Sequence, residues 1–205
     1  MRLIALPGYA DTPRYWSHLF GGLGTVENVE WPGIWGTYIS ANPLEQIIEK
    51  VLPRAPGSVL VAHSTGCRLA LHIATQAPVA GVALLAPALG PLSILEPVDM
   101  ILWKNRGARR SLRPDPDTGA TLTIEVPYIY AEALLAQPPA PKLDCPVLAC
   151  LMSSDKKHNK TFSSISVAND TSEVLIGGPH RWWEDVDVAG EVVDSVTEWS
   201  TTLPQ

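Results

Sequence analysis

Short apolar runs alternate with amphipathic segments along most of this 205-residue chain. Residues 3–6, 58–62 and 79–86 are apolar stretches of strand length, and Pro7-Gly8 ends the first of them. Such alternation is typical of βαβ units, in which parallel strands are joined by helices that pack on the sheet. The sequence therefore predicts a three-layer α/β fold, with about six mainly parallel strands and helices on both faces.

The remaining elements follow from the same periodicities. We expect further strands over residues 26–31, 146–152 and 173–176, and helices over residues 13–23, 43–52, 65–76 and 189–200. The helix over 43–52 also has its start signals, because Asn42 can cap it and Pro43 suits its first turn.

The alternation breaks over residues 90–144, which are rich in proline and turn residues. The sequence Pro-Asp-Pro-Asp-Thr-Gly at 114–119 predicts a hairpin tip. A connection this long within a compact domain is usually functional. We expect one domain over residues 1–205, with a cap of approximately residues 90–144 inserted between two strands.

Composition excludes several classes of protein. The net charge of −6 disfavours a nucleic-acid partner, which would require a basic surface. The chain has no apolar run near the roughly 20 residues that span a bilayer. Its first residues predict a strand and not a signal peptide, so the expected location is cytoplasmic. The three cysteines show no metal-binding spacing, and neither a metal nor a disulfide framework is expected.

The strongest chemical signal is Val-Leu-Val-Ala-His-Ser-Thr-Gly-Cys-Arg-Leu-Ala over residues 59–70. A predicted strand enters Ala62-His63-Ser64-Thr65-Gly66, and an amphipathic helix follows at once. This context gives the G-x-S-x-G pattern its meaning, because a serine on a sharp strand-to-helix turn is exposed as a nucleophile. Small residues two before and two after the serine are needed there. The alternative is that Ser64 only caps the helix.

An acid and a histidine follow in the order that such a nucleophile requires. Asp155 lies three residues past the strand that ends at Met152, and His180 follows the strand that ends at Ile176. Both positions are at carboxyl ends of strands, where open α/β sheets bind ligands. The acid has an alternative earlier in the chain, at Glu96 or Asp99.

Taken together, these motifs resemble the α/β-hydrolase superfamily over nearly the whole chain except residues 90–144. The chain is similar to a minimal member that begins at the superfamily's third strand. Pro7-Gly8 stands where His-Gly is common, and Ala62 replaces the usual first glycine, as in some bacterial lipases. The resemblance implies Ser64, His180 and Asp155 as catalytic triad, and the N–H groups of Tyr9 and Thr65 as oxyanion hole. It implies no cofactor.

The reaction implied is cleavage of a carboxylic ester, a thioester or a lactone through an acyl-enzyme. A lyase or acyltransferase on the same triad is one alternative, since fold and triad do not determine the fate of the acyl group. A non-catalytic small-molecule receptor is another. The sequence specifies no oligomeric state.

Two groups of residues bear on the substrate. Trp16, Trp103 and Trp182 lie where they would line a pocket for a small apolar acyl or aromatic ester, unless they are ordinary core residues. A third of all basic residues lie close together at Lys104, Arg106, Arg109, Arg110 and Arg113. This run is either a solvated face or a site for a carboxylate or phosphate of the substrate.

The remaining histidines have simpler interpretations. His63 is expected beneath the turn at Ser64, and His18 and His72 are expected to be structural residues on helices. His158 is expected in a solvated loop.

Overall fold

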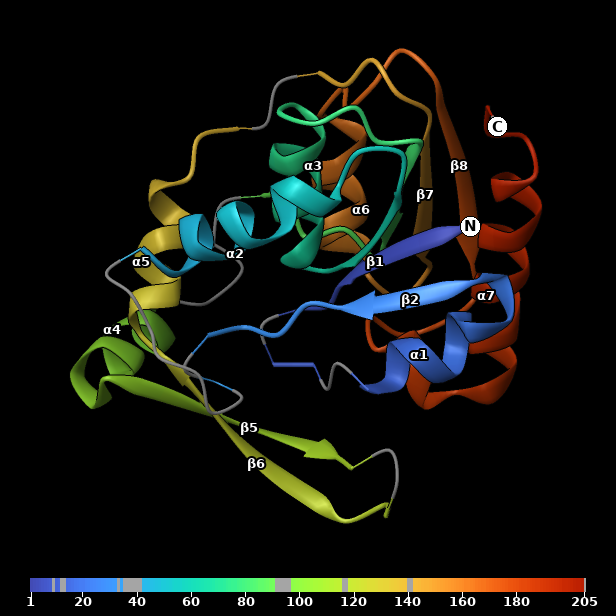
Figure 1. The fold of residues 1–205 in the computed structure, drawn as a ribbon. Helices are drawn as coiled ribbons and strands as arrows, with labels where there is room; N and C mark the ends of the chain where they lie inside the picture. The colour runs from blue at the N-terminus through green and yellow to red at the C-terminus, as the bar shows by residue number, and fades with distance from the viewer. Residues whose placement is uncertain are drawn as a thin grey trace.

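A parallel sheet forms the centre of the molecule (Figure 1). The computed structural model describes residues 1–8, 10–11, 14–32, 34, 42–90, 97–115, 118–139 and 142–204. Within these residues the main sheet has six strands in the order β2-β1-β3-β4-β7-β8. They are β1 Arg2–Leu6, β2 Thr25–Asn28, β3 Val59–His63, β4 Gly81–Leu85, β7 Val147–Met152 and β8 Thr171–Ile176. The α/β class and the parallel sheet predicted from the sequence are confirmed.

The strand order changes direction between β1 and β3. The chain passes from β1 outward to β2, then returns to β3 on the other side of β1 and continues through β4 and β7 to β8. Parallel sheets bind ligands outside the carboxyl ends of the strands at such a switch point. Here those ends are followed by Pro7-Gly8 after β1 and by Ser64 after β3.

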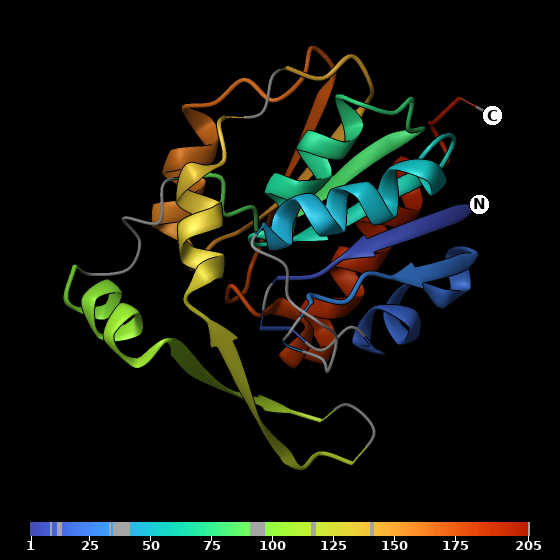
Figure 2. The same ribbon diagram turned by 60° about the vertical axis from the view of Figure 1, so that its left-hand side comes forward.

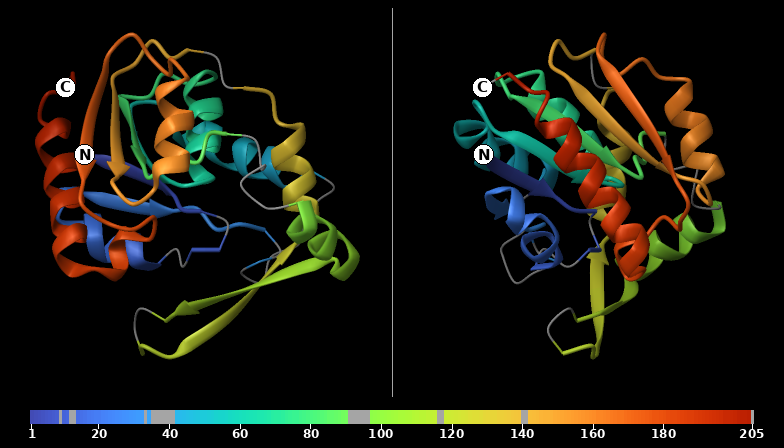
Figure 3. Two further views of the ribbon diagram at one scale, coloured as in Figure 1. Left: turned by 180° about the vertical axis from the view of Figure 1, so that it is seen from behind. Right: turned by 90° about the vertical axis from the view of Figure 1, so that its right-hand side faces the viewer.

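Helices cover both faces of the sheet, as the views from behind and from the side show (Figure 3). Helices α1 Arg14–Phe20 and α7 Val186–Ser200 pack on one face, and α2 Pro43–Val51, α3 Gly66–Ala74 and α6 Lys156–Ser163 pack on the other. A hydrophobic layer lies between the sheet and the helices on each face, and alternate residues of a strand point into the two layers. Leu3 and Ala5 of β1 face the first layer, while Ile4 and Leu6 face the second. This period of two fixes the register of each strand, because a slip of one residue would exchange the faces.

A second, smaller unit lies between β4 and β7 in the chain. It consists of α4 Pro97–Arg106, the antiparallel strands β5 Ala108–Pro114 and β6 Thr121–Pro127, and α5 Ile129–Ala136. We call these elements the α4–α5 segment. Its hairpin projects away from the main sheet, whereas α5 lies beside α2 (Figure 2). Pro114 at the end of β5 pairs with Thr121 at the start of β6, so the predicted tip falls between two paired strands. Residues 116 and 117 of this tip lie outside the described residues.

Side-chain hydrogen bonds fix the α4–α5 segment internally and on the main body. Within the segment, the indole N–H of Trp103 donates to the carbonyl of Val126 over 2.9 Å. Toward the body, the phenol of Tyr130 donates to the carbonyl of Pro32. Both aromatic side chains are buried. The base of the segment is therefore packed, while the outer hairpin is not.

Some element boundaries differ from those expected. The last helix begins at Val186 instead of residue 189, because the Asp185 carboxylate accepts hydrogen bonds from the N–H groups of Asp187 and Val188 and caps it. Helix α6 was not predicted at all. Its only buried side chain is Phe162, so it lacks the repeating apolar face by which helices are found in sequences.

The start of α3 lies against the end of β1, and this contact requires a glycine. A Cβ on Gly66 would overlap the carbonyl oxygen of Leu6 and lie 2.7 Å from that of Pro7. These are backbone atoms and cannot move aside as a flexible side chain would. The predicted need for a small residue at position 66 thus has a specific steric cause.

We expect Gly66→Ala to lower the free energy of unfolding by about 3 kcal/mol, because the methyl group can fit only if α3 and β1 separate. Gly190→Ala is the matched control, since a Cβ on this α7 residue meets no atom within 4 Å. The control should raise stability by about 0.5–1 kcal/mol, the usual gain at an exposed helix position. Chemical denaturation of the two variants tests this, and equal effects would contradict the steric explanation.

Candidate active site

Ser64 stands on a sharp turn between β3 and α3. Its φ of 52° lies in the left-handed region, which residues other than glycine rarely adopt. Two backbone hydrogen bonds hold it there: the Ser64 N–H donates to the carbonyl of Leu85, and the Ala88 N–H donates to the carbonyl of Ser64. Strained backbone of this kind persists only where surrounding structure enforces it. The turn leaves the Ser64 side chain partly exposed at the switch point of the sheet.

Ser64, His180 and Asp155 form a continuous hydrogen-bonded chain. Nε2 of His180 lies 2.8 Å from Oγ of Ser64, and Nδ1 of the same ring lies 2.5 Å from Oδ2 of Asp155. The three residues follow β3, β8 and β7, so the carboxyl ends of neighbouring strands bring them together. The geometry lets Asp155 hold the proton on Nδ1, which leaves Nε2 free to accept the Ser64 proton.

Asp155, and not Asp99, lies against His180. Asp99 is in the first turn of α4 and lines a cavity beside the hairpin. Glu96, the other alternative, lies outside the described residues. The loops that carry the acid and the histidine are also tied together, because the Ser154 N–H donates to the carbonyl of Gly178 over 3.2 Å.

A second, buried pair of residues holds the backbone of His180. Nε2 of His63 lies 3.1 Å from the carbonyl oxygen of His180, and Nδ1 lies 2.6 Å from Oδ2 of Asp11. Because a carbonyl oxygen can only accept, Nε2 must carry a proton for this bond, and Nδ1 then shares a second proton with Asp11. The Gly8 N–H also donates to Oδ2 of Asp11 over 2.7 Å.

His158 is part of the site, which corrects the expectation of a solvated loop residue. It lies on α6 with a side chain only 12% exposed, and its ring stacks on that of His180 with 5.0 Å between centroids. Its Nε2 is 3.7 Å from Oδ1 of Asp155. Burial lowers the pKa of His158, and His180 lowers it further, while Asp155 raises it. No sequence pattern identified this residue, since a histidine three positions after an acid is common on any helix.

The predicted pocket tryptophans are core residues. Trp16 and Trp182 are 2% and 0% exposed, in a buried aromatic cluster with Phe20 and Trp183. The cluster supports His63, whose ring centroid lies 4.5 Å from that of Trp183. Trp103 is also buried, in the α4–α5 segment. Trp16 and Trp182 therefore cannot form the wall of an open pocket in this structure.

The predicted oxyanion donors are described only in part. Tyr9 lies outside the described residues. Thr65 is buried and directly precedes the first turn of α3, where helix N–H groups favour negative charge. Gly8 is a poor substitute as a donor, because its N–H already binds Asp11.

Asp155, His158 and His180 also offer a potential set of metal ligands. One donor atom from each of the three residues lies within 4.8 Å of the others. However, Nδ1 of His180 and Oδ2 of Asp155 already face each other across a hydrogen bond. An ion that used these atoms would have to displace the shared proton, so the geometry favours a proton-transfer chain at this position.

Comparison with known families supports the assignment of the fold. The sequence pattern of the alpha/beta hydrolase family matches residues 3–195, nearly the whole chain. The chain belongs to this family. The curated proteins contain no match to this alpha/beta hydrolase.

Several solved structures share the fold. A monoacylglycerol lipase from Paleococcus ferrophilus has a TM-score of 0.71 at 18% identity, covering 97% of this chain and 93% of its own. Alpha/beta hydrolase domain-containing protein 10 from mouse has a TM-score of 0.65 at 19% identity, covering 98% and 89%. A thioesterase from the prodiginine biosynthetic pathway of Streptomyces coelicolor has a TM-score of 0.63 at 15% identity, covering 97% and 89%. At these identities the likeness establishes the fold alone.

No helix in the described part of the chain is long and apolar enough to cross a membrane.

The lowered pKa of His158 predicts that this alpha/beta hydrolase loses stability in mild acid. Below the ordinary histidine pKa of about 6.5, the unfolded chain binds a proton that the folded protein takes up only at lower pH. The free energy of unfolding should therefore fall as the pH drops from 7.5 to 5.5. His158→Gln should reduce that fall, because it removes the group whose pKa is lowered.

Chemical denaturation at both pH values measures the effect. Lys156→Gln is the matched control on the same helix, since Lys156 is exposed and does not titrate in this range. A His158→Gln variant with the parent's full pH dependence would contradict the burial argument.

Proposed function

We propose that this protein is a serine hydrolase that cleaves small apolar carboxylic esters, or the related thioesters or lactones, through an acyl-enzyme. One observation carries the proposal: His180 bridges Ser64 and Asp155 through its two ring nitrogens, at 2.8 Å and 2.5 Å. A serine with this partner, on a strained turn at a helix N-terminus, is equipped for nucleophilic attack. The printed names of similar structures, among them a monoacylglycerol lipase and a thioesterase, support ester or thioester cleavage.

In the proposed reaction Oγ of Ser64 attacks the acyl carbon while its proton passes to Nε2 of His180. The electron pair of the carbonyl moves to its oxygen, which the N–H groups of Tyr9 and Thr65 would stabilise. When the carbonyl re-forms, the bond to the leaving oxygen or sulfur breaks, and His180 returns the proton to that atom. Water then attacks the acyl-enzyme by the same steps and releases the acid.

Asp155 and the Asp11–His63 pair have different parts in this scheme. Asp155 keeps Nδ1 protonated and stabilises the imidazolium that forms during attack. His63 acts on the backbone of His180 and is a positioning residue.

We also propose that the α4–α5 segment is a cap at the edge of the site and that the whole chain is one domain. Helix α5 of the segment packs against α2, and this contact anchors the segment to the main body.

Replacement of the nucleophile is the direct test. Ser64→Ala should abolish labelling by a fluorophosphonate probe and lower kcat for a p-nitrophenyl ester by about 10⁵–10⁶-fold. Ser172→Ala is the control, because Ser172 is an exposed serine on β8. An active-site adduct on Ser64→Ala would contradict the assignment. If the parent protein binds esters but shows neither labelling nor turnover, it is a receptor. If it transfers the acyl group to an added alcohol in preference to water, it is an acyltransferase.

The acid is tested by Asp155→Asn, which keeps the shape of the side chain but favours the wrong histidine tautomer. In well-studied triads this change lowers kcat by about 10⁴-fold, and we expect a similar loss here. Asp187→Asn, at an exposed aspartate in the first turn of α7, should stay within about twofold of the parent. Steady-state kinetics at neutral pH, with circular dichroism to verify folding, distinguishes the two. Parental activity in Asp155→Asn would exclude this residue as the acid.

A further inference from the structure

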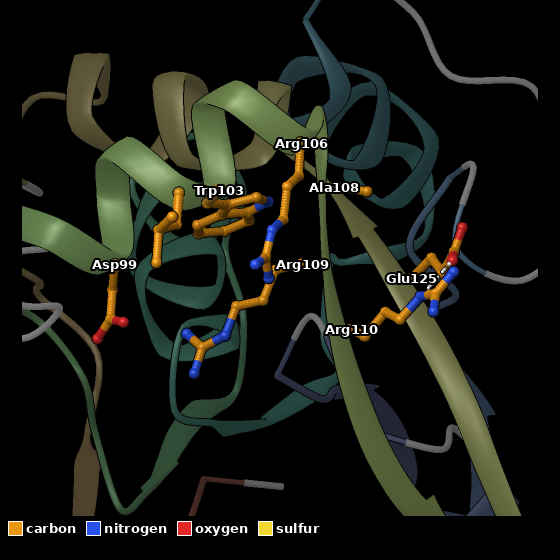
Figure 4. Close-up of a pocket in the computed structure, with 8 residues that line it drawn as sticks. Asp99, Trp103, Arg106, Ala108, Arg109, Arg110 and Glu125 are labelled. Carbon is orange, nitrogen blue, oxygen red and sulfur yellow. Dashed lines mark hydrogen bonds and ion pairs between the residues drawn. The ribbon is translucent and has the colours of Figure 1, made fainter.

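A cavity of about 560 Å³ lies between helix α4 and the hairpin of the α4–α5 segment. Its walls carry three arginines and two carboxylates: Arg106, Arg109, Arg110, Asp99 and Glu125. Figure 4 shows the Arg106 side chain beside the Trp103 indole, with the Arg109 guanidinium below it in this view. Arg110 points away from them, toward Glu125, with which it forms an ion pair of 2.9 Å.

Arg106 and Arg109 have no ion-pair or hydrogen-bond partner among the residues that the structure describes. Arg106 comes from the last turn of α4 and Arg109 from the start of β5, and Gly107, with a φ of 71°, makes the turn between them. Two unpaired guanidinium groups repel each other at any physiological pH, because arginine does not lose its proton. An anion placed between them would remove that repulsion.

The Trp103 part of the cavity wall is fixed. The Trp103 side chain is 2% exposed, and its N–H is bound to the carbonyl of Val126. Its ring also contacts Tyr128 edge-on, with 5.9 Å between centroids. This wall therefore needs no ordering when a ligand enters the cavity, which lowers the entropic cost of binding.

Asp99 lines the same cavity. In the described part of the chain no ion pair joins it to Arg106 or Arg109, so it leaves the two guanidinium groups available. Its carboxylate nevertheless opposes the negative charge of a ligand in this cavity.

We infer that Arg106 and Arg109 form a binding site for a phosphate group. A phosphate monoester carries a charge of about −1.5 to −2 at pH 7 and so balances two guanidinium groups, whereas a carboxylate carries only one negative charge. The inference rests on the proposed function, which it deepens: the phosphate would belong to the non-acyl part of the ester or thioester, as in a phosphorylated carrier arm. Free phosphate has the same chemistry and is distinguished by the experiment.

The test compares 4′-phosphopantetheine with pantetheine, which lacks only the phosphate, by titration calorimetry on the full chain. The parent should bind 4′-phosphopantetheine at least about tenfold more tightly, and Arg106→Ala/Arg109→Ala should remove most of that difference. Lys104→Ala is the matched control: it deletes a positive charge from the same helix at a residue that does not line the cavity. This control should retain the preference within about twofold.

A second variant gives an effect of the opposite sign. Asp99→Asn should tighten 4′-phosphopantetheine binding, because it removes a negative charge from the lining of the same cavity. Inorganic phosphate that displaces 4′-phosphopantetheine supports the site, and inorganic phosphate that binds where 4′-phosphopantetheine does not would assign it to free phosphate. Equal affinity for 4′-phosphopantetheine and pantetheine, without binding of inorganic phosphate, would overturn the inference, as would an undiminished preference in the double variant. Because these are binding measurements, they do not depend on turnover at Ser64, and a failure of the hydrolase assignment would be seen separately.

Discussion

The close approach of helix α3 to the end of strand β1 is the constraint on which the site depends. Gly66 brings the start of the helix against the carbonyl groups of Leu6 and Pro7, a distance that no side chain would permit. The chain can reach this position directly from β3 only through a sharp turn, and Ser64 takes the left-handed conformation at that turn. The Pro7 carbonyl also accepts a hydrogen bond from the indole of Trp31, so the same contact links β1, α3 and the segment after β2. Backbone strain at Ser64 is therefore maintained by packing around it and not by the turn alone.

His180 depends on a second constraint, which acts from two directions. Its ring is held by Asp155, and its backbone carbonyl is held by His63. His63 in turn is paired with Asp11, and both side chains are almost completely buried, at 2% and 6% exposure. A buried carboxylate without its partner would be strongly destabilising, since its desolvation would no longer be compensated. The pair therefore cannot move apart without a large cost. We infer that this is why a loop of small residues, Gly177-Gly178-Pro179, can hold a histidine in a defined position.

The sequence allowed part of this arrangement to be predicted, for a physical reason. Ser64, Asp155 and His180 each follow an apolar strand of clear periodicity, and the carboxyl ends of parallel strands must meet at one edge. The partner of His63 could not be predicted in this way, because Asp11 is 52 residues away and lies in a turn without regular structure. The role of His158 depends on helix α6, whose polar sequence conceals it. From the sequence, Trp16 and Trp182 suit either a pocket or the core, because aromatic residues near a cleft occur in both. Only the packing of Phe20 and Trp183 against them decides between these alternatives.

The α4–α5 segment carries a cluster of arginines, although the whole chain has a negative net charge. The short range of electrostatic interactions in salt solution explains how such a cluster can still attract an anion. A net charge of −6 would repel an anionic substrate if it acted at long range. At physiological ionic strength, however, charges in solvent are screened beyond about 8 Å. The acidic residues on distant surfaces therefore contribute little inside the cavity, whose lining includes the unpaired Arg106 and Arg109. The hairpin that lines one side of the cavity projects away from the main sheet (Figure 2). Residues of this hairpin can therefore change to suit one part of a substrate, while the packing that holds Ser64 and His180 is left undisturbed.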